Sequence, residues 1–328
     1  ESLEFHLFEM ANKLALTFDE VALGFNVYPI NSLTYRAYPY LKSRLLHHKT
    51  ERFGYDSRRK ELYVFNLNSK GNIIGFQVRA LDDNGGPKYK TWNIERIYDR
   101  LKKPLNVTEE ELDSLNKISM IFGILTTDLS RQFTVFEGPI DSFFMSNTIG
   151  LTGVKKQILD FDDIPTVRYF FDNDIEGKSK MIQKLKRGNT VFMWDKFLKD
   201  FDIPQRKVKD LNELYLPFVK AFFQKCKTAI DKELPGTLFL GCRTHRGPNV
   251  LGRGALGSVD VFSVNVYDSR VRSWQVPVDA DIPILSSEFH FGAVDRGVPS
   301  PGLSGSWDQR QRALSFAHYL ASALADPR

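Results

Sequence analysis

The spacing of apolar residues in the first part of the chain predicts helices followed by a hairpin. Residues 1–50 are expected to be mostly helical with loops, since apolar side chains recur every three to four positions over 5–14. Residues 61–67 and 73–79 are predicted strands, joined by Asn-Ser-Lys-Gly-Asn, a typical turn sequence. After a Gly-Gly-Pro loop, residues 88–92 read Lys-Tyr-Lys-Thr-Trp. Cations interleaved with aromatics suit contact with nucleic acid.

From about residue 118 the pattern changes to strands alternating with helices. The expected strands are short and apolar, and they lie at 133–136, 149–151, 167–171 and 190–194. Helices are expected at 142–147 and 175–186. This alternation argues for a mainly parallel sheet.

Beyond about residue 215 a further series of apolar segments begins. An amphipathic helix is expected over 217–231 and an outer helix over 308–325. Between them, strands are expected at 237–243, 259–267 and 282–288. Each is almost continuously apolar, as buried parallel strands are.

Composition suits a globular chain with room for more than one domain. The chain has 328 residues, 42% of them hydrophobic and 26% charged. No apolar run reaches the roughly 18 residues of a membrane span, and the first residues, Glu-Ser-Leu-Glu-Phe, show no signal-peptide pattern. Cys226 and Cys242 do not form a CxxC pair, so a zinc knuckle is not indicated.

The distribution of cations divides the chain. All 24 lysines lie at or before Lys232, whereas the nine cations of the last 96 residues are all arginine. No structural requirement explains the absence of lysine from so long a stretch of surface. The chain is therefore interpreted as a chimera of two sequences of different origin. A natural two-domain protein with uneven surfaces is the alternative.

Acidic residues follow two of the predicted parallel strands. Glu137 comes directly after one strand and Asp172 after another, with Asp141 and Asp174 close behind them. Ligands gather beyond the carboxyl ends of parallel strands, so these carboxylates are expected to converge. Carboxylate oxygens are ligands for Mg²⁺ or Mn²⁺ and can support phosphoryl chemistry. The alternative role is helix capping, which would explain Asp141 and Glu176 in particular.

The two acidic segments resemble the signature motifs of the Toprim domain. The segment 136–141, Phe-Glu-Gly-Pro-Ile-Asp, is similar to the first, and 169–178, Tyr-Phe-Phe-Asp-Asn-Asp-Ile-Glu-Gly-Lys, to the second. Residues 209–213, Lys-Asp-Leu-Asn-Glu, resemble a later primase element, and the hairpin with its Lys-Tyr segment resembles the basic subdomain before Toprim in DnaG-type primases. The resemblance covers about residues 50–214.

This resemblance implies a Mg²⁺-dependent nucleotidyl transferase that makes RNA primers on single-stranded DNA from ribonucleotides. Glu137 would be the general acid/base or a metal ligand, and Asp141, Asp172 and Asp174 would be further ligands. Lys178, Lys88, Lys90 and Arg79 would contact nucleic acid. A replicative helicase is an implied partner and the cytoplasm the implied compartment. The primase zinc module is absent from these residues, and a Toprim nuclease or a non-catalytic nucleic-acid-binding module remain alternatives.

A separate carboxylate stands at the end of a predicted strand in the last part of the chain. Glu288 is followed by His290, and Asn265 and Tyr267 end the preceding strand. A carboxylate in this position of a barrel strand indicates catalysis, and glycosidases use two of them. Asn265, Tyr267 and His290 are therefore candidate sugar-binding residues.

The segments 238–243, 261–267 and 288–297 resemble the late part of β-agarase-type glycoside hydrolases, which are (β/α)₈ barrels. The resemblance covers about residues 216–328 and implies that Glu288 is the nucleophile. Only three of the barrel strands are predicted, and the strand that would carry the acid/base is missing. Asn212-Glu213 matches the Asn-Glu pair that carries the acid/base in these enzymes, but it follows no predicted buried strand. We expect no glycan hydrolysis from this part alone.

The sequence thus predicts an α/β chain in three parts. A basic α+β subdomain is expected over 1–115, a Toprim-like metal-binding domain with a mainly parallel sheet over 116–214, and a partial (β/α)₈ barrel over 215–328. Primer synthesis is the preferred function, and galactan hydrolysis by Glu288 is the alternative. Polysaccharide would be a partner, and secretion would apply, only for the glycosidase.

Overall fold

The computed structural model describes residues 3–82, 87–152, 161–204, 208–243, 249–271, 281–297, 300 and 302–325. It falls into two compact units. The amino-terminal unit comprises Glu1–Lys196 and Arg206–Asn212, and the carboxy-terminal unit comprises Phe197–Gln205 and Glu213–Arg328. Each unit contains both helices and strands, so the chain is mixed α/β.

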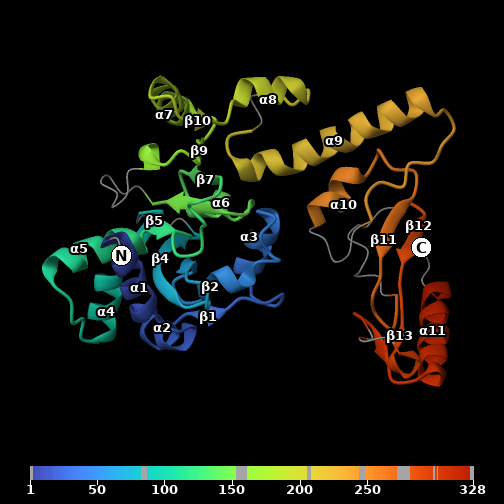
Figure 1. The fold of residues 1–328 in the computed structure, drawn as a ribbon, viewed down its shortest axis with the longest axis horizontal. Coiled ribbons are helices and arrows are strands. Elements are labelled where there is room, and N and C mark those ends of the chain that lie inside the picture. The colour runs from blue at the N-terminus through green and yellow to red at the C-terminus, as the bar shows by residue number, and fades with distance from the viewer. Residues whose placement is uncertain are drawn as a thin grey trace. The chain divides into compact units, whose positions relative to one another are not determined.

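The amino-terminal unit contains an antiparallel sheet (Figure 1). Its order β1-β2-β3-β4-β5 follows the chain, and every pairing is antiparallel. The expected hairpin is its centre, formed by β3 (Glu61–Leu67) and β4 (Ile73–Ala80). The other strands are β1 (Tyr28–Pro29), β2 (Phe53–Asp56) and β5 (Tyr89–Trp92). The helices are α1 (Leu3–Leu14), α2 (Phe18–Phe25), α3 (Ala37–Ser43), α4 (Ile94–Leu101) and α5 (Glu109–Ser119).

A second sheet of this unit is mainly parallel. Its order is β10-β9-β7-β8-β6, and only the β6–β8 pairing is antiparallel. The strands are β6 (Ile121–Phe122), β7 (Phe133–Phe136), β8 (Thr148–Leu151), β9 (Val167–Phe170) and β10 (Thr190–Val191). The helices are α6 (Pro139–Ser142), α7 (Ile175–Lys186) and α8 (Trp194–Asp200), the last of which runs into the carboxy-terminal unit.

Two local expectations in this sheet are wrong. The helix expected over 142–147 forms earlier, as α6, because Pro139 fits its first turn and residues 143–147 turn back toward β8. The strand expected over 190–194 ends at Val191. Trp194 instead begins α8, and its indole N–H donates to the carbonyl of Phe171 over 2.7 Å.

The two sheets share one hydrophobic core, so residues on either side of position 115 pack together. Tyr63 and Phe76 from the first sheet belong to the same buried cluster as Val135 and Tyr169 from the second. Asn66, which is 1% exposed, ties the sheets together because its amide donates to the carbonyls of Ser119 and Ile121. This buried amide is fully hydrogen-bonded, as burial requires.

The carboxy-terminal unit is built around a long helix and two short parallel pairs. The helices are α9 (Leu211–Glu233), α10 (Asn249–Ala255) and α11 (Gln309–Leu324). The paired strands are β11 (Phe262–Asn265) with β12 (Ile284–Glu288), and β13 (Gly292–Ala293) with β14 (Gly305–Ser306).

The strand expected over 237–243 does not form. These residues join no ladder, and Leu238 is 64% exposed. Two of the three expected barrel strands therefore pair within the described residues. The helix expected to begin at Pro217 begins six residues earlier, so that Pro217 lies inside α9.

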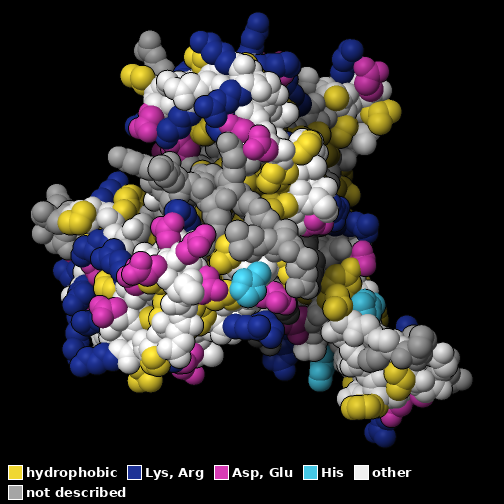
Figure 2. Space-filling model, turned by 60° about the vertical axis from the view of Figure 1, so that its left-hand side comes forward, with side chains coloured by type: hydrophobic (Ala, Val, Ile, Leu, Met, Phe, Trp, Pro, Cys, Tyr) yellow, Lys and Arg dark blue, Asp and Glu magenta, His cyan; other side chains and the backbone are white. Residues whose placement is uncertain are grey.

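Positive and negative side chains are interspersed on the face drawn in Figure 2, in keeping with the formal charge of +5. None of the described helices combines the length and the apolar character needed to cross a membrane.

Candidate functional site

Glu137 and Asp172 lie beyond the carboxyl ends of adjacent parallel strands. Phe136, the last residue of β7, is in register with Phe170, the last residue of β9. Glu137 follows at once and Asp172 two residues on, and the backbone N–H of Asp172 donates to Glu137 Oε1 over 3.1 Å. The register of the sheet therefore brings together two carboxylates that are 35 positions apart.

The carboxyl of Asp172 is surrounded by other acidic side chains. Burial, followed by the charges of Asp141, Glu137, Asp210 and Asp174, raises the pKa of its carboxyl to about 7. The structure thus gathers all four sequence-predicted acids around one position and adds Asp210. Carboxyls that repel one another in this way are frequent at functional sites.

Each surrounding acid already has a partner. Glu137 Oε2 accepts from Lys180 Nζ over 2.6 Å, and Lys180 also pairs with Glu176. Asp174 caps α7 by accepting from the N–H of Gly177 over 2.7 Å. These contacts hold the carboxylates at the sheet edge.

Two further contacts connect the acids with distant segments. Asp141 Oδ1 accepts from the backbone N–H of Asn212 over 3.2 Å. Asp210 pairs with Arg44 over 3.2 Å. The segment 210–212 therefore closes the cluster, although none of its residues is a predicted site residue.

Carboxylate oxygens are the ligands that a hard divalent cation prefers. In the described parts of the chain, no three Asp, Glu, His or Cys side chains are already arranged to hold an ion. A divalent cation bound among these carboxylates would relieve the repulsion that raises the pKa of the half-buried Asp172. Asp172, Asp174, Glu137 and Asp141 remain the predicted ligands.

Gly177 allows α7 to begin against the turn that carries Asp172. A Cβ at Gly177 would lie 2.1 Å from the carbonyl oxygen of Asp172 and 2.9 Å from its backbone nitrogen. The Cβ of any other residue at this position would overlap the backbone of Asp172. The glycine of the Asp-Asn-Asp-Ile-Glu-Gly segment is thus explained by the close approach of the helix to the site.

The predicted nucleic-acid-binding residues are not all free to bind. The guanidinium of Arg79 lies 5.1 Å from the ring centroids of both Tyr40 and Tyr89. Lys88 Nζ is 6.0 Å from the centroid of the Tyr89 ring. Lys90 and Lys178 instead form ion pairs with Glu61 at 2.9 Å and with Asp195 at 3.6 Å. Arg79, Tyr89 and Lys88 therefore form a cationic and aromatic platform.

Tyr40 and Arg44, neither of which is a predicted site residue, connect this platform with the acidic cluster. Burial raises the pKa of Tyr40, while the charges of Arg79 and Arg44 lower it. The Tyr40 hydroxyl is buried without a hydrogen-bond partner among the described residues. Arg44 pairs with Asp210. Only the packing of α3 could reveal these roles.

In the carboxy-terminal unit, the structure brings Asn265, Tyr267 and Glu288 together. Asn265 and Glu288 are register partners in β11 and β12, and Glu288 Oε2 accepts from Asn265 Nδ2 at 3.3 Å. Tyr267 donates to Glu288 Oε1, a hydrogen bond that raises the pKa of the Tyr267 hydroxyl. Arg243 pairs with Glu288 at 3.3 Å. The contacts described for Glu288 thus supply no second carboxylate, the group that glycosidases pair with the first.

His290 lies beside this carboxylate site and packs on Tyr267, with ring centroids 5.2 Å apart. Its Nε2 accepts from the backbone N–H of Leu303 over 3.2 Å. This bond ties His290 to the following loop, which leaves the other ring nitrogen for a ligand or water.

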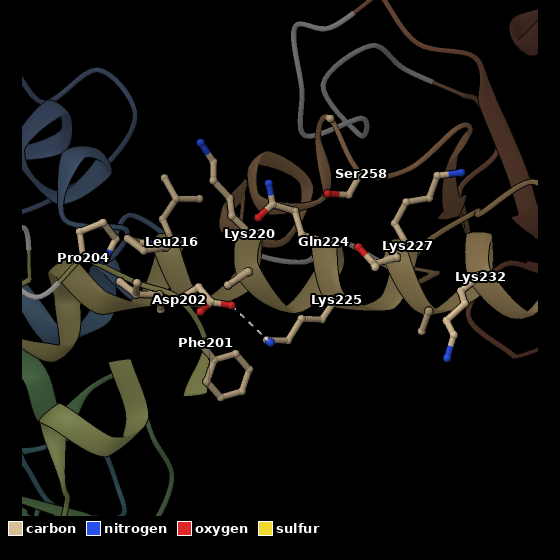
Figure 3. Close-up of a pocket in the computed structure, with 16 residues that line it drawn as sticks. Phe201, Asp202, Pro204, Leu216, Lys220, Gln224, Lys225, Lys227, Lys232 and Ser258 are labelled. Atoms are coloured by element: carbon tan, nitrogen blue, oxygen red, sulfur yellow. Dashed lines mark ion pairs between the residues drawn. The ribbon is translucent and has the colours of Figure 1, made fainter. Parts of the chain in front are cut away.

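A broad groove of about 860 Å³ follows α9 in the carboxy-terminal unit (Figure 3). Lys220, Lys225, Lys227 and Lys232 line it, and Lys225 pairs with Asp202 over 3.6 Å. Figure 3 shows these lysines directed to different sides of the helix. The groove therefore offers no convergent set of charges.

Comparison with known proteins finds sequence similarity to β-agarases, and no family model matches the chain. The chain is 29% identical over 149 residues to β-agarase B and 32% identical over 126 residues to β-agarase A, both from Vibrio sp. (strain JT0107). These matches cover 43% and 35% of this chain. The chain spans only 16% and 13% of those two proteins.

Similar solved structures include members of both groups that the sequence resembles. A crystal structure of an agarase has 32% identity and a TM-score of 0.33, over 36% of this chain and 19% of that chain. A DnaG primase catalytic domain bound to single-stranded DNA has 14% identity and a TM-score of 0.28, over 71% of this chain and 84% of that chain. TM-scores of this size do not establish a shared fold.

Proposed function

We propose that the amino-terminal unit is a Mg²⁺-dependent nucleotidyl transferase of the DnaG-primase type, which makes RNA primers on single-stranded DNA. The observation that carries this proposal is the convergence of Glu137, Asp141, Asp174 and Asp210 on the half-buried Asp172 at the end of two parallel strands. The motifs that contain these residues also resemble Toprim motifs. The fold supplies the carboxylates that such chemistry needs.

The proposed metal ligands are four carboxylates, two of which have other partners in the structure. Asp172, Asp174, Glu137 and Asp141 would hold the metal, which when bound offsets negative charge on the phosphates of a nucleotide. Until then, Lys180 balances Glu137 and Asp174 caps α7. Glu137 would act as the general acid/base in the proposed reaction, once Lys180 moves away from its Oε2.

The platform of Arg79, Tyr89 and Lys88 would hold the template strand. A base can stack on Tyr89 while Arg79 and Lys88 face phosphates, a combination that binds single strands without regard to sequence. Lys178 would join them after leaving Asp195, from which it is separated by 3.6 Å. Ribonucleotides, single-stranded DNA and a replicative helicase are the proposed partners, in the cytoplasm.

The proposal is tested by magnesium binding and primer synthesis measured on the same samples. Calorimetric titration with Mg²⁺ or Mn²⁺ and ribonucleotide incorporation on single-stranded DNA should both be lost in the double variant Asp172→Asn/Asp174→Asn. A matched control, Asp99→Asn/Asp113→Asn, removes two carboxylates of α4 and α5 and should retain both signals.

Other outcomes select among the alternatives. Metal binding with DNA cleavage but no incorporation would identify a Toprim nuclease. DNA binding that weakens steeply with salt and ignores metal would identify a binding module. Unchanged metal binding in the double variant would overturn the proposed site.

A second candidate function, β-agarase-type hydrolysis of galactan by the carboxy-terminal unit, is favoured by the similarity to β-agarases. Glu288 would be its nucleophile, and Asn265, Tyr267 and His290 would bind sugar hydroxyls. Since the contacts of Glu288 include no second carboxylate, we expect no activity from this chain alone. Release of reducing ends from agarose should therefore equal that of a Glu288→Gln control, and any excess over that control would contradict this expectation.

A further inference from the structure

The amino-terminal unit contains a small polar pocket of about 230 Å³, apart from the acidic cluster. Three of the residues that line it, Phe65, Phe122 and Phe143, are buried aromatics. Among the described residues of the lining, the charged ones are Lys49 and Arg52, and both are cations. Neither residue is a predicted site residue.

One turn of 3₁₀ helix fixes the two cations relative to each other. This helix, Thr50–Arg52, follows Lys49 directly, and the N–H of Arg52 donates to the carbonyl of Lys49 over 3.0 Å. Lys49 Nζ donates to the carbonyl of Phe143. The guanidinium of Arg52 lies 5.7 Å from the centroid of the Phe143 ring. Both side chains therefore converge on one residue of the pocket wall.

The positive charge of this pair is not balanced by an ion pair among the described residues. No described carboxylate lies within ion-pair distance of Lys49 or Arg52. Burial and the charge of Arg52 lower the pKa of Lys49, and the exposed Glu51 offsets this only in part. An anion in the pocket would relieve the same repulsion.

The hydroxyl groups of the wall do not compete with this pair. Thr126 and Thr127 line the pocket, but their hydroxyls already donate to the carbonyl of Gly123 at 3.1 and 2.8 Å. Lys49 keeps two further N–H bonds after its contact with Phe143, and Arg52 has a fork of donors suited to oxyanions. The attraction for an anion thus comes from the two cations.

We propose that Lys49 and Arg52 form a binding site for a phosphate group, distinct from the metal centre. The pocket is smaller than the roughly 300–1,000 Å³ of sites that enclose whole drug-sized ligands. It would therefore take a single phosphate, carried either by a free nucleotide or by a nucleic-acid strand whose remainder stays outside.

The site is tested by calorimetric titration of the whole chain with inorganic phosphate in buffer containing EDTA. The variant Lys49→Gln/Arg52→Gln should bind phosphate at least about tenfold more weakly, because both charge-assisted contacts are removed. The exchange Lys49→Arg/Arg52→Lys keeps the charges and should retain most of the affinity. The control Lys70→Gln/Arg131→Gln removes two exposed cations elsewhere in the unit and should bind like the parent.

Titrations with adenosine monophosphate and with oligodeoxythymidine then distinguish the two sources of phosphate. Tighter binding of the mononucleotide would identify a nucleotide site, and tighter binding of the oligomer a strand contact. Thermal unfolding confirms that each variant folds. Equal phosphate binding by the glutamine variant and the parent, or no binding by the parent at millimolar phosphate, would overturn the proposal. Magnesium titration of the same variants should be unchanged, so failure here is distinguishable from failure of the metal centre.

Discussion

Replacing Gly177 with Ala is expected to destabilise the amino-terminal unit by roughly 2–4 kcal/mol. The added Cβ would lie 2.1 Å from the carbonyl oxygen of Asp172, where neither side of the contact is a flexible side chain. The helix α7 or the turn after β9 must therefore move. Either movement displaces Asp172 from the other carboxylates, so magnesium affinity should fall together with stability.

The first signature motif supplies a matched control for this substitution. A Cβ at Gly138 would meet nothing within 4 Å, and the backbone there is extended, with φ −136°. We expect Gly138→Ala to change the free energy of unfolding by no more than about 0.5 kcal/mol. Chemical denaturation of both variants measures the difference. Similar stabilities for the two variants would show that the close approach of α7 to Asp172 is not a constraint.

Replacing Asp172 with Asn is expected to stabilise the metal-free protein at alkaline pH. The folded pKa of Asp172, about 7, lies above the roughly 3.9 of an unfolded Asp. Below about pH 4 the Asp172 carboxyl is protonated in both the folded and the unfolded state, so it does not oppose folding. As pH rises from there through 7, the carboxyl ionises more readily in the unfolded state, and the folded state loses stability relative to it. Asn is neutral throughout and avoids that loss. Since Asp172 is half-buried and partly screened, we expect a gain of about 1–2 kcal/mol at pH 8.

The test compares unfolding of parent and Asp172→Asn protein in EDTA at pH 5 and pH 8. The advantage of Asn should be present at pH 8 and mostly absent at pH 5. Magnesium should reverse the order at pH 8 by stabilising the parent alone. A variant that is less stable than the parent at pH 8 without metal would mean that the carboxylate is not repelled by its neighbours.

Strands set by local patterns could be predicted from the sequence. The hairpin of β3 and β4 was expected within one residue, because an apolar run, a turn sequence and a second apolar run are adjacent in the chain. The helix α7 was expected at its observed bounds, whereas Asp174, which caps it, was expected only as a metal ligand. The convergence of Glu137 on Asp172 followed from the general geometry of parallel strands.

Features that depend on packing between distant segments could not be predicted. Asp210 joins the acidic cluster only because the chain returns to the sheet about 38 residues after Asp172. Arg44 and Tyr40 reach it from α3, and nothing in their neighbours indicates this. The apolar run at 237–243 shows the opposite failure, since Leu238 and Leu240 resemble strand residues but have no neighbouring strand to cover them.

The interleaving of the two units constrains how the chain can be divided and how it folds during synthesis. The segment Phe197–Gln205 belongs to the carboxy-terminal unit, yet Arg206–Asn212, with Asp210, belongs to the amino-terminal one. Phe197 and Phe201 pack on Phe218, with ring centroids 5.4 and 4.9 Å apart. A fragment that stops at residue 196 therefore lacks Asp210 of the acidic cluster. A fragment that stops at residue 212 lacks Phe218, on which Phe197 and Phe201 pack.

On a ribosome, the amino-terminal unit cannot complete its acidic cluster until residue 212 has emerged. At that point Phe197 and Phe201 have emerged, but Phe218 of α9, on which they pack, has not. Domains usually fold in order as they emerge, and apolar surface exposed in the interval favours misassembly. The route of the chain between the two units thus leaves Phe197 and Phe201 uncovered until Phe218 has been synthesised.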